Sequence, residues 1–162
     1  DIKYAALRYF NAAGYDLNKR VIGKEKNTEN LIPLIMEVVK GNNPFISIYG
    51  NDYHTKDGTG VRDYVHVSDL ANAHVSALEY LRRSSKNLIL NLGSETGFSV
   101  MEILKKTKDI LNIDIPYQIE KRRVGDVAKV VSSCSLAEHI LKWSKKHSDL
   151  DTIIRSTWDI YN

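Results

Sequence analysis

The sequence predicts an α/β fold in which short strands alternate with amphipathic helices. Of the 162 residues, 43% are hydrophobic, so the chain has enough apolar side chains to build one compact domain with a core. Apolar runs of strand length are separated by segments with helical spacing, and this alternation is typical of α/β proteins. No internal repeat or low-complexity tract interrupts the pattern.

The first strand and the first helix are expected before residue 41. The apolar run at residues 5–10 suits a central strand, and the turn-forming sequence NAAG ends it. Residues 16–27 are polar and irregular. Residues 31–40 then place apolar side chains at helical spacing, and Gly41 follows as the expected end of the helix.

The middle of the chain is expected to contain three strands and one helix. The strands are predicted at residues 45–49, 63–67 and 88–92. Ser68 is expected to cap the helix that follows the second of these strands. Helical spacing groups four side chains on the face that this helix is expected to bury, namely Leu70, His74, Leu78 and Leu81.

The last third of the chain begins with a clear helix start. Ser99 is followed three residues later by Glu102, which is a capping box before the sequence VMEILKKTKDIL. Two short strands and two helices are expected after it, at residues 117–120, 129–131, 135–143 and 150–161. In the last helix Ile154, Trp158 and Tyr161 form a stripe that predicts core packing.

Composition and charge argue against several classes of protein. The net charge is only +3 and the basic residues are spread along the chain, so no nucleic-acid partner is expected. No apolar run approaches the ~18 residues of a membrane span and no signal peptide is visible, which predicts a cytoplasmic protein without a membrane contact. The single cysteine, Cys134, and the scattered histidines predict neither a disulfide nor a metal site.

The stretch GNDYHTKDGTGVRDYVHV, residues 50–67, carries the strongest local signal for a binding site. Its glycines and aspartates favour sharp turns, and the strand that follows should point Arg62 and Tyr64 to the same face. An arginine at the edge of such a loop is suited to hold a phosphate with two parallel hydrogen bonds. The alternative is that Arg62 pairs with Asp63 or Asp69 on the surface, and spacing alone favours neither interpretation.

A second basic loop, KRRVGDV at residues 121–127, is also a candidate. Arg122 and Arg123 would supply positive charge, and Asp126 would accept hydrogen bonds from sugar hydroxyls. An ordinary solvated loop has the same composition, so this loop alone is weak support for a site. Two basic loops that converge would be suited to a diphosphate, which neither loop predicts by itself.

Three further polar or aromatic residues stand where strands or helices end. Asn11 follows a strand, and ligands of open α/β sheets bind outside such strand ends. Asn30 lies at a helix start, and Tyr49 at a strand end would stack on a base. Each residue has an ordinary structural alternative, as a turn, a helix start or an edge-strand tyrosine. Tyr15 and Lys19 have YxxxK spacing but lie in a loop, so we do not assign them a catalytic role.

Five motifs in order resemble the C-terminal half of the UDP-glucose 4-epimerases, which are extended short-chain dehydrogenases. They are LRYFNAAG, NLIP, IYGNDYHTKDGTGVRDYVHVSDLANAH, NLGSETGFSV and KRRVGD, and the match runs from Leu7 to the end of the chain. The resemblance implies that residues 1–162 are the C-terminal part of a Rossmann-type protein. This part would comprise the smaller substrate-binding domain and the last strands and helices of the Rossmann sheet, and the NAD-binding half would be absent from this chain.

The resemblance implies an activity that interconverts UDP-glucose and UDP-galactose. In this family NAD takes hydride from C4 of the hexose while a tyrosine removes the O4 proton, and the hydride returns to the opposite face. The chain has no GxxGxxG loop, no catalytic serine at the family's position and no helical YxxxK. No catalytic residue is therefore expected in this chain, and alone it is expected to be inactive. The full-length members are usually homodimers.

The resemblance also assigns roles to eleven positions. Tyr9 would lie beside the nicotinamide, and Val130 would be the specificity gate that some members fill with a tyrosine. The residues expected at the UDP-sugar are Asn11, Asn30, Leu31, Ser47, Tyr49, Arg62, Tyr64, Arg123 and Asp126. Because valine is smaller than tyrosine, two alternative activities stay open, those of a UDP-N-acetylglucosamine 4-epimerase and of a dual-specificity epimerase. An alternative of another class is a non-catalytic UDP-sugar-binding remnant.

Overall fold

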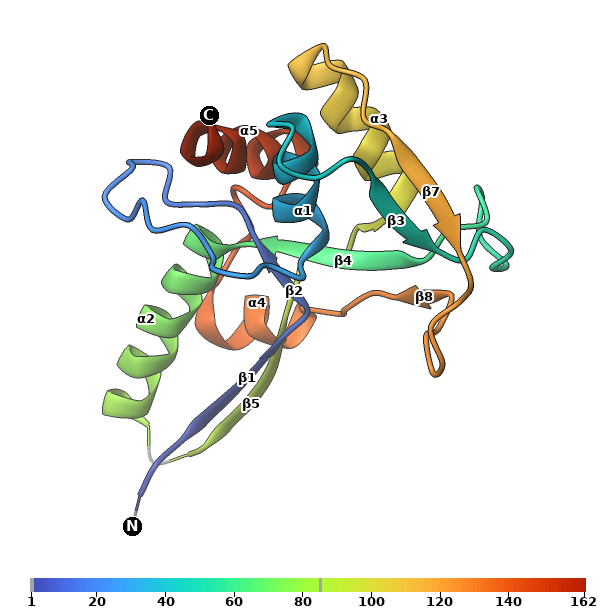
Figure 1. Ribbon diagram of the computed structural model, residues 1–162. Helices are drawn as coiled ribbons and strands as arrows, with labels where there is room; N and C mark the ends of the chain where they lie inside the picture. The colour runs from blue at the N-terminus through green and yellow to red at the C-terminus, as the bar shows by residue number, and fades with distance from the viewer. Residues whose placement is uncertain (1, 85) are drawn as a thin grey trace.

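The computed structural model describes residues 2–84 and 86–162, and it confirms the α/β class (Figure 1). The strands are β1 (Ala5–Tyr9), β2 (Asn11–Ala13), β3 (Ile46–Tyr49), β4 (Val61–His66), β5 (Leu88–Leu92), β6 (Gly97–Ser99), β7 (Tyr117–Glu120) and β8 (Lys129–Val130). The helices are α1 (Leu31–Val39), α2 (Val67–Arg83), α3 (Val100–Leu111), α4 (Ser135–Leu141) and α5 (Leu150–Tyr161). Within the described residues, no helix combines the length and the apolar character that crossing a membrane requires.

Strand β4 joins segments that lie far apart in the sequence. It pairs in parallel with β2 and with β8, and antiparallel with β6. Two further parallel pairs, β1–β5 and β3–β7, lie on either side of it in Figure 1. Polar side chains of β4 are therefore neighbours of loops from several parts of the chain.

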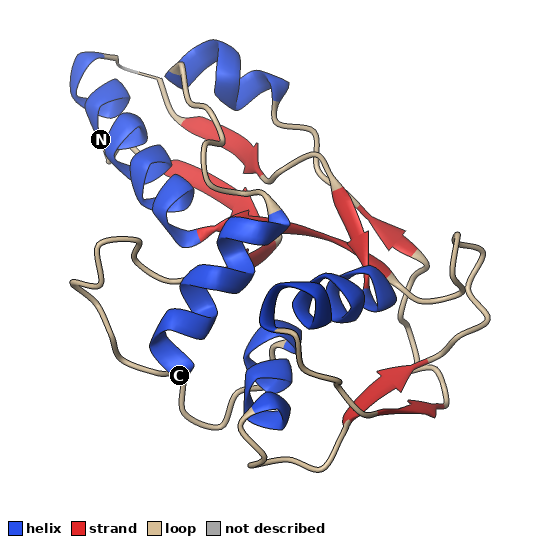
Figure 2. Cartoon of the chain, turned by 90° about the horizontal axis from the view of Figure 1, so that it is seen from above, coloured by secondary structure: helices blue, strands red, loops and turns tan. Residues whose placement is uncertain are grey.

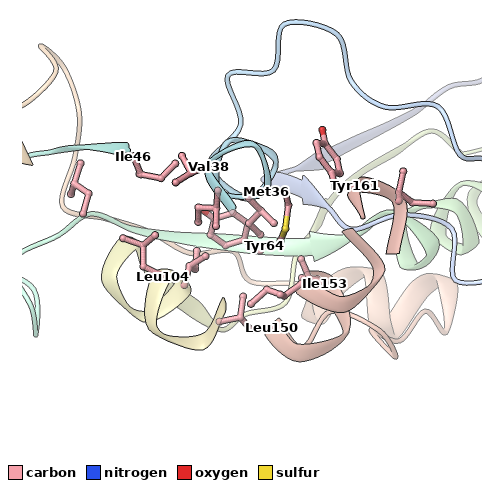
Figure 3. Close-up of a cluster of buried hydrophobic side chains, with 14 residues drawn as sticks. Met36, Val38, Ile46, Tyr64, Leu104, Leu150, Ile153 and Tyr161 are labelled. Carbon is pink, nitrogen blue, oxygen red and sulfur yellow. The ribbon is translucent and has the colours of Figure 1, made fainter. Parts of the chain in front are cut away.

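Two hydrophobic clusters lie on opposite faces of β4. Tyr64 belongs to the cluster of α1, β3, α3 and α5, several of whose side chains are labelled in Figure 3. The next residue, Val65, belongs to the cluster of α2, β5 and α4. Because successive side chains of a strand point to opposite faces, this alternation fixes which residues of β4 face which core. Figure 2 shows the helices arranged around the strands.

The prediction for α2 was wrong in two respects. The N-cap residue is His66, whose Nδ1 accepts a hydrogen bond from the Ser68 N–H at 3.0 Å, so Ser68 lies inside the helix. The buried face contains Leu70, Ala73 and Ala77, whereas Leu78 is 51% exposed. Small alanine side chains let the helix pack closely on β1, β4 and β5. This close packing, and not the burial of its larger side chains, determines which face of the helix points inward.

Several boundaries also differ from the prediction. The NAAG segment, expected to be only a turn, contains the short strand β2, and β4 begins two residues before the predicted start. Helix α4 ends at Leu141, because Lys142 has a left-handed backbone with φ 52°. The expected core stripe of α5 is confirmed, since Ile154 and Tyr161 are buried and Trp158 packs against the same cluster.

The capping box of α3 is confirmed and supports a stability prediction. The Ser99 hydroxyl accepts the Glu102 N–H at 3.0 Å, and the Glu102 carboxylate accepts the Ser99 N–H at 2.9 Å. We expect Ser99→Ala to lower the free energy of unfolding by at least about 1 kcal/mol, because the helix-capping bond and the bond from the same hydroxyl to Asp57 are both lost. Urea denaturation measures this change.

Asn30→Ala is the matched control for the cap. Asn30 is the N-cap residue of α1, but its side chain makes no capping hydrogen bond. Its replacement should therefore change the unfolding free energy by less than about 0.5 kcal/mol. Equal losses in the two variants would contradict the capping role of Ser99.

Candidate functional site: a cavity lined by two basic loops

The nine residues expected at the UDP-sugar all line one cavity of about 400 Å³. Strands β2, β3 and β4, the start of α1 and the loop after β7 contribute to its wall. The nine residues are Asn11, Asn30, Leu31, Ser47, Tyr49, Arg62, Tyr64, Arg123 and Asp126. Sequence reasoning missed Tyr53, which also lines the cavity and is 5% exposed.

Arg62 joins the two basic loops. Its Nη2 donates to the Asp126 carboxylate at 2.7 Å, and its Nη1 donates to the Val61 and Val127 carbonyl oxygens, each at 2.9 Å. The alternative in which Arg62 pairs with Asp63 or Asp69 is therefore wrong, because both carboxylates are fully buried and bonded to other groups. The loops converge as the diphosphate hypothesis requires.

The second loop places two arginines over aromatic rings. The Arg123 guanidinium lies 3.8 Å from the ring centroid of Tyr49, and that of Arg122 lies 4.1 Å from the ring centroid of Tyr53. Arg122 also donates to the Asp52 carboxylate at 2.6 Å. Guanidinium groups stack favourably on aromatic faces, so these contacts hold positive charge beside flat rings at the cavity wall.

The two asparagines enter the cavity wall from β2 and α1. Asn11 is the register partner of Tyr64 in the β2–β4 pair, which sets the two side chains beside each other. The Asn30 amide donates to both oxygens of Glu25, at 3.0 and 3.1 Å, so Glu25 is another contact that the sequence did not reveal. The Asn30 side chain does not cap α1, so it accepts from none of the first N–H groups of that helix. A helix start whose N–H groups are not capped by a side chain is suited to bind an anion.

The loop between β3 and β4 is held by Asp57. Its carboxylate accepts hydrogen bonds from the Thr59 N–H at 2.9 Å and from the Thr59 hydroxyl at 2.7 Å, and it also bonds the Ser99 hydroxyl. Although burial opposes ionisation, these hydrogen bonds lower the pKa of Asp57. The loop that delivers Arg62 to the cavity is thus fixed to the start of α3.

The remaining two predicted site residues lie outside this cavity. Tyr9 is 48% exposed at the end of β1, with its ring centroid 6.2 Å from that of His74. Val130 is partly buried on β8, opposite Arg62 in register. A second cavity of about 790 Å³ shares Ala12, Ala13, Asn30 and Pro33 with the first, and Tyr15 and Glu25 also line it.

The sequence profile of the NAD dependent epimerase/dehydratase family matches residues 1–93, more than half of the chain. The chain belongs to this family. It is 42% identical over 159 residues to a UDP-glucose 4-epimerase of Halalkalibacterium halodurans, covering 98% of this chain and 47% of the relative. The chain thus spans about half the length of the curated relatives it matches, and the resemblance stated from the sequence is confirmed.

Two solved structures are similar over nearly the whole chain. A UDP-glucose 4-epimerase of Brucella ovis in complex with NAD superposes with a TM-score of 0.94 at 39% identity, covering 99% of this chain and 49% of that one. A UDP-glucose-4-epimerase of Stenotrophomonas maltophila with NAD and formylated UDP-arabinopyranose gives a TM-score of 0.92 at 39% identity, covering 99% and 48%. These likenesses confirm the Rossmann-type α/β fold of this family member.

NAD and a metal ion would each need particular residues in this family member. Tyr9 offers an exposed aromatic ring at the carboxyl end of β1, which fits the face of a nicotinamide. No glycine-rich sequence of the GxxGxxG type occurs in the chain to hold a dinucleotide phosphate. Within the described residues, no three His, Cys, Asp or Glu side chains gather in a group suited to a metal ion.

His66, the last residue of β4, connects this strand to three other segments. Its Nδ1 accepts the Ser68 N–H, so its Nε2 carries the proton and donates to the Ser156 hydroxyl at 3.1 Å. The same hydroxyl accepts the Tyr15 N–H at 3.2 Å. His66 is fully buried, and burial holds its pKa below the usual value, against the opposing charge of Asp69.

This neutral histidine predicts a pH dependence of stability. Because the folded-state pKa of His66 lies below about 6.5, the unfolded chain binds more protons near that pH. The contribution is fully present above pH 6.5 and is lost as the pH falls through 6.5 toward the lower folded-state pKa. We expect urea midpoints to fall between pH 7 and 5 in the wild type. His66→Gln should flatten this slope, and an unchanged slope would contradict the assignment.

Proposed function

We propose that this chain anchors the UDP-sugar in a UDP-glucose 4-epimerase. The observation that carries the proposal is the convergence of Arg62, Arg123 and Asp126 on one cavity that also contains Asn11, Asn30 and Tyr49. Positive charge, an open helix start and an aromatic face together suit a nucleoside diphosphate. The relatives named UDP-glucose 4-epimerase favour UDP as that diphosphate.

Ligand binding would rearrange two of the contacts in the cavity. Arg62 would transfer a guanidinium N–H from Asp126 to a phosphate oxygen, which frees Asp126 to accept from ribose hydroxyls. Arg123 would leave the Tyr49 ring for the diphosphate, and the uracil would stack on the freed ring beside Ser47. Without the nucleotide Arg62 thus pairs with a carboxylate and Arg123 stacks on an aromatic ring, and with it both would contact the diphosphate.

The hexose would extend from the diphosphate past Asn11 and Asn30 toward the second cavity. NAD, when bound, supplies reversible hydride acceptance at C4 of the hexose. In this chain only Tyr9 is proposed to face the nicotinamide, and Val130 is proposed to limit the size of the sugar. The NAD-binding half and the catalytic serine and tyrosine are proposed to lie outside this chain, and the complete enzyme to be a homodimer.

The proposal is tested by calorimetric titration of the chain with UDP and, as control, with ADP. We expect UDP to bind and ADP to bind at least about tenfold more weakly, a difference of about 1.4 kcal/mol. Equal affinities would contradict a uracil site, and no binding of either would contradict the diphosphate site. In a second assay, the chain with UDP-glucose and NAD+ should form no UDP-galactose. Turnover would show that the chain contains its own catalytic groups.

A further inference from the structure

Asp63 is a buried carboxylate that the UDP-sugar site itself does not use. It lies on β4 between Arg62 and Tyr64, and it is 0% exposed. Its Oδ1 accepts the N–H and the hydroxyl of Ser94, at 2.7 and 2.6 Å. Its Oδ2 accepts the N–H and the hydroxyl of Ser132 and the Glu95 N–H, at 2.9, 2.5 and 3.2 Å. Within the described residues no cation pairs with it.

The hydrogen bonds keep this carboxylate ionised. Burial alone would raise the pKa of Asp63, but the hydrogen bonds from Ser132 and Ser94 hold it below the usual value. Space around the carboxylate is also tight, since a Cβ added to Gly93 would lie 2.2 Å from the Ser132 hydroxyl and 2.5 Å from Asp63 Oδ2. Ser132 therefore has little freedom to move relative to β4.

Of the two serines bonded to Asp63, one belongs to a segment that lines the cavity and the other does not. Ser94 follows β5 and lies away from the cavity lining. Ser132 ends the segment 123–132, which begins with Arg123 and includes Asp126 and Val130. Strand β8 has only two residues, which pair with Val61 and Arg62 of β4. Outside this short pairing, the Ala128 carbonyl accepts the Val61 N–H, and Arg62 bonds the Val127 carbonyl and the Asp126 carboxylate.

We propose that Asp63 and Ser132 form a clamp that positions segment 123–132 against Arg62 for the diphosphate. The inference rests on the proposed UDP-sugar function. Neither residue touches the ligand: both act through Asp126 and Arg123, whose distance from Arg62 depends on where β8 sits along β4. When UDP takes Arg62 away from Asp126, that ion pair no longer holds the loop, and the clamp then holds it together with the short β4–β8 pairing.

The clamp can be removed without unfolding the segment that follows. The Cys134 N–H donates to the Glu95 carboxylate at 2.7 Å, and the Cys134 sulfur accepts the Gly93 N–H at 2.9 Å. These bonds do not involve the Ser132 side chain. Ser132→Ala loses the hydroxyl bond to Asp63 and the contact of that hydroxyl with the Cys134 sulfur at 3.3 Å, while the backbone N–H of residue 132 can still donate to Asp63.

The matched control is Ser94→Ala. Ser94 and Ser132 are 5% and 9% exposed, and each hydroxyl bonds the Asp63 carboxylate. Each hydroxyl also has a second neighbour, the Thr96 backbone for Ser94 and the Cys134 sulfur for Ser132. Loss of such a bond should lower the melting temperatures of both variants by similar amounts. Ser132→Ala should also raise the UDP dissociation constant about fivefold, whereas Ser94→Ala should leave it within about twofold of wild type. Calorimetric titration of the full chain with UDP measures both.

The outcomes separate the clamp from the function on which it rests. If wild type fails to bind UDP, the proposed function fails and the clamp with it. If wild type binds UDP but the two serine variants share one dissociation constant, the clamp alone is overturned. Should Ser132→Ala not fold, Asp63→Asn gives the second measurement. It retains the shape of the side chain and should weaken UDP binding more than Ser94→Ala, and equal affinities would overturn the clamp.

Discussion

Replacement of Arg62 by alanine is expected to raise the UDP dissociation constant about 100-fold, which corresponds to about 2.8 kcal/mol. The guanidinium is the group that spans both loops, with its Nη2 2.7 Å from Asp126. Charge-assisted hydrogen bonds to phosphate contribute about 1.5–3 kcal/mol each. The variant loses them and also leaves the Asp126 carboxylate without its counter-charge in a cavity that must accept a dianionic group. Calorimetric titration with UDP measures the loss.

Two further variants make this result specific. Arg83→Ala removes an exposed arginine that pairs with Glu79 at the end of α2 and does not line the cavity, so it should leave UDP affinity unchanged. Arg62→Lys keeps the charge but loses the planar fork, so its affinity should fall between those of wild type and Arg62→Ala. If Arg62→Ala bound UDP as tightly as wild type, the diphosphate could not lie at Arg62.

The site depends on the alternation of side chains along β4. Arg62 and Tyr64 line the cavity, while Asp63 between them points to the opposite side and bonds the segments after β5 and β8. One strand therefore both presents the phosphate-binding group and fixes the loop that must meet it. Burial raises the pKa of the Tyr64 phenol, so Tyr64 stays neutral beside Arg62 at physiological pH.

Local patterns predicted most of the fold. The capping box at Ser99 and Glu102 and the apolar stripe of α5 depend on neighbours within four residues, and both are present in the structure. Strand β2 was missed because its three residues, Asn11 to Ala13, are polar or small and have no strand pattern of their own. It exists because β4 lies alongside to pair with it.

Contacts between distant residues were the part that the sequence could not predict. Arg62 and Asp126 are 64 positions apart, and spacing offered two nearer aspartates that turned out to be buried structural acids. One signal was available: a charged Asp63 between two residues assigned to the ligand face must occupy the other, interior face. A buried carboxylate requires several donors. Which serines supply them depends on tertiary packing.

Gly58→Ala is expected to cause the largest loss of stability, about 4 kcal/mol. A Cβ at this position would lie 2.0 Å from the backbone carbonyl oxygen of Asn51 and 2.8 Å from its carbonyl carbon. The Tyr53 N–H donates to the Gly58 carbonyl oxygen at 2.9 Å. Because this hydrogen bond joins the two sides of the loop, they cannot move apart to make room for a Cβ without breaking it. The backbone φ of +79° adds strain of about 1 kcal/mol for any L side chain.

Gly41→Ala isolates the steric part of this loss. Gly41 has nearly the same φ, +77°, but a Cβ there would meet no atom within 4 Å. That variant should lose only the conformational contribution, about 1 kcal/mol, so the difference of about 3 kcal/mol measures the collision with Asn51. Because the loop from Gly50 leads directly into Arg62, Gly58→Ala should also weaken UDP binding, whereas Gly41→Ala should not. Urea denaturation measures the unfolding free energies of the two variants. Equal values would mean that the loop opens to accommodate the alanine side chain at position 58. The close approach of Asn51 would then not explain why this position needs glycine.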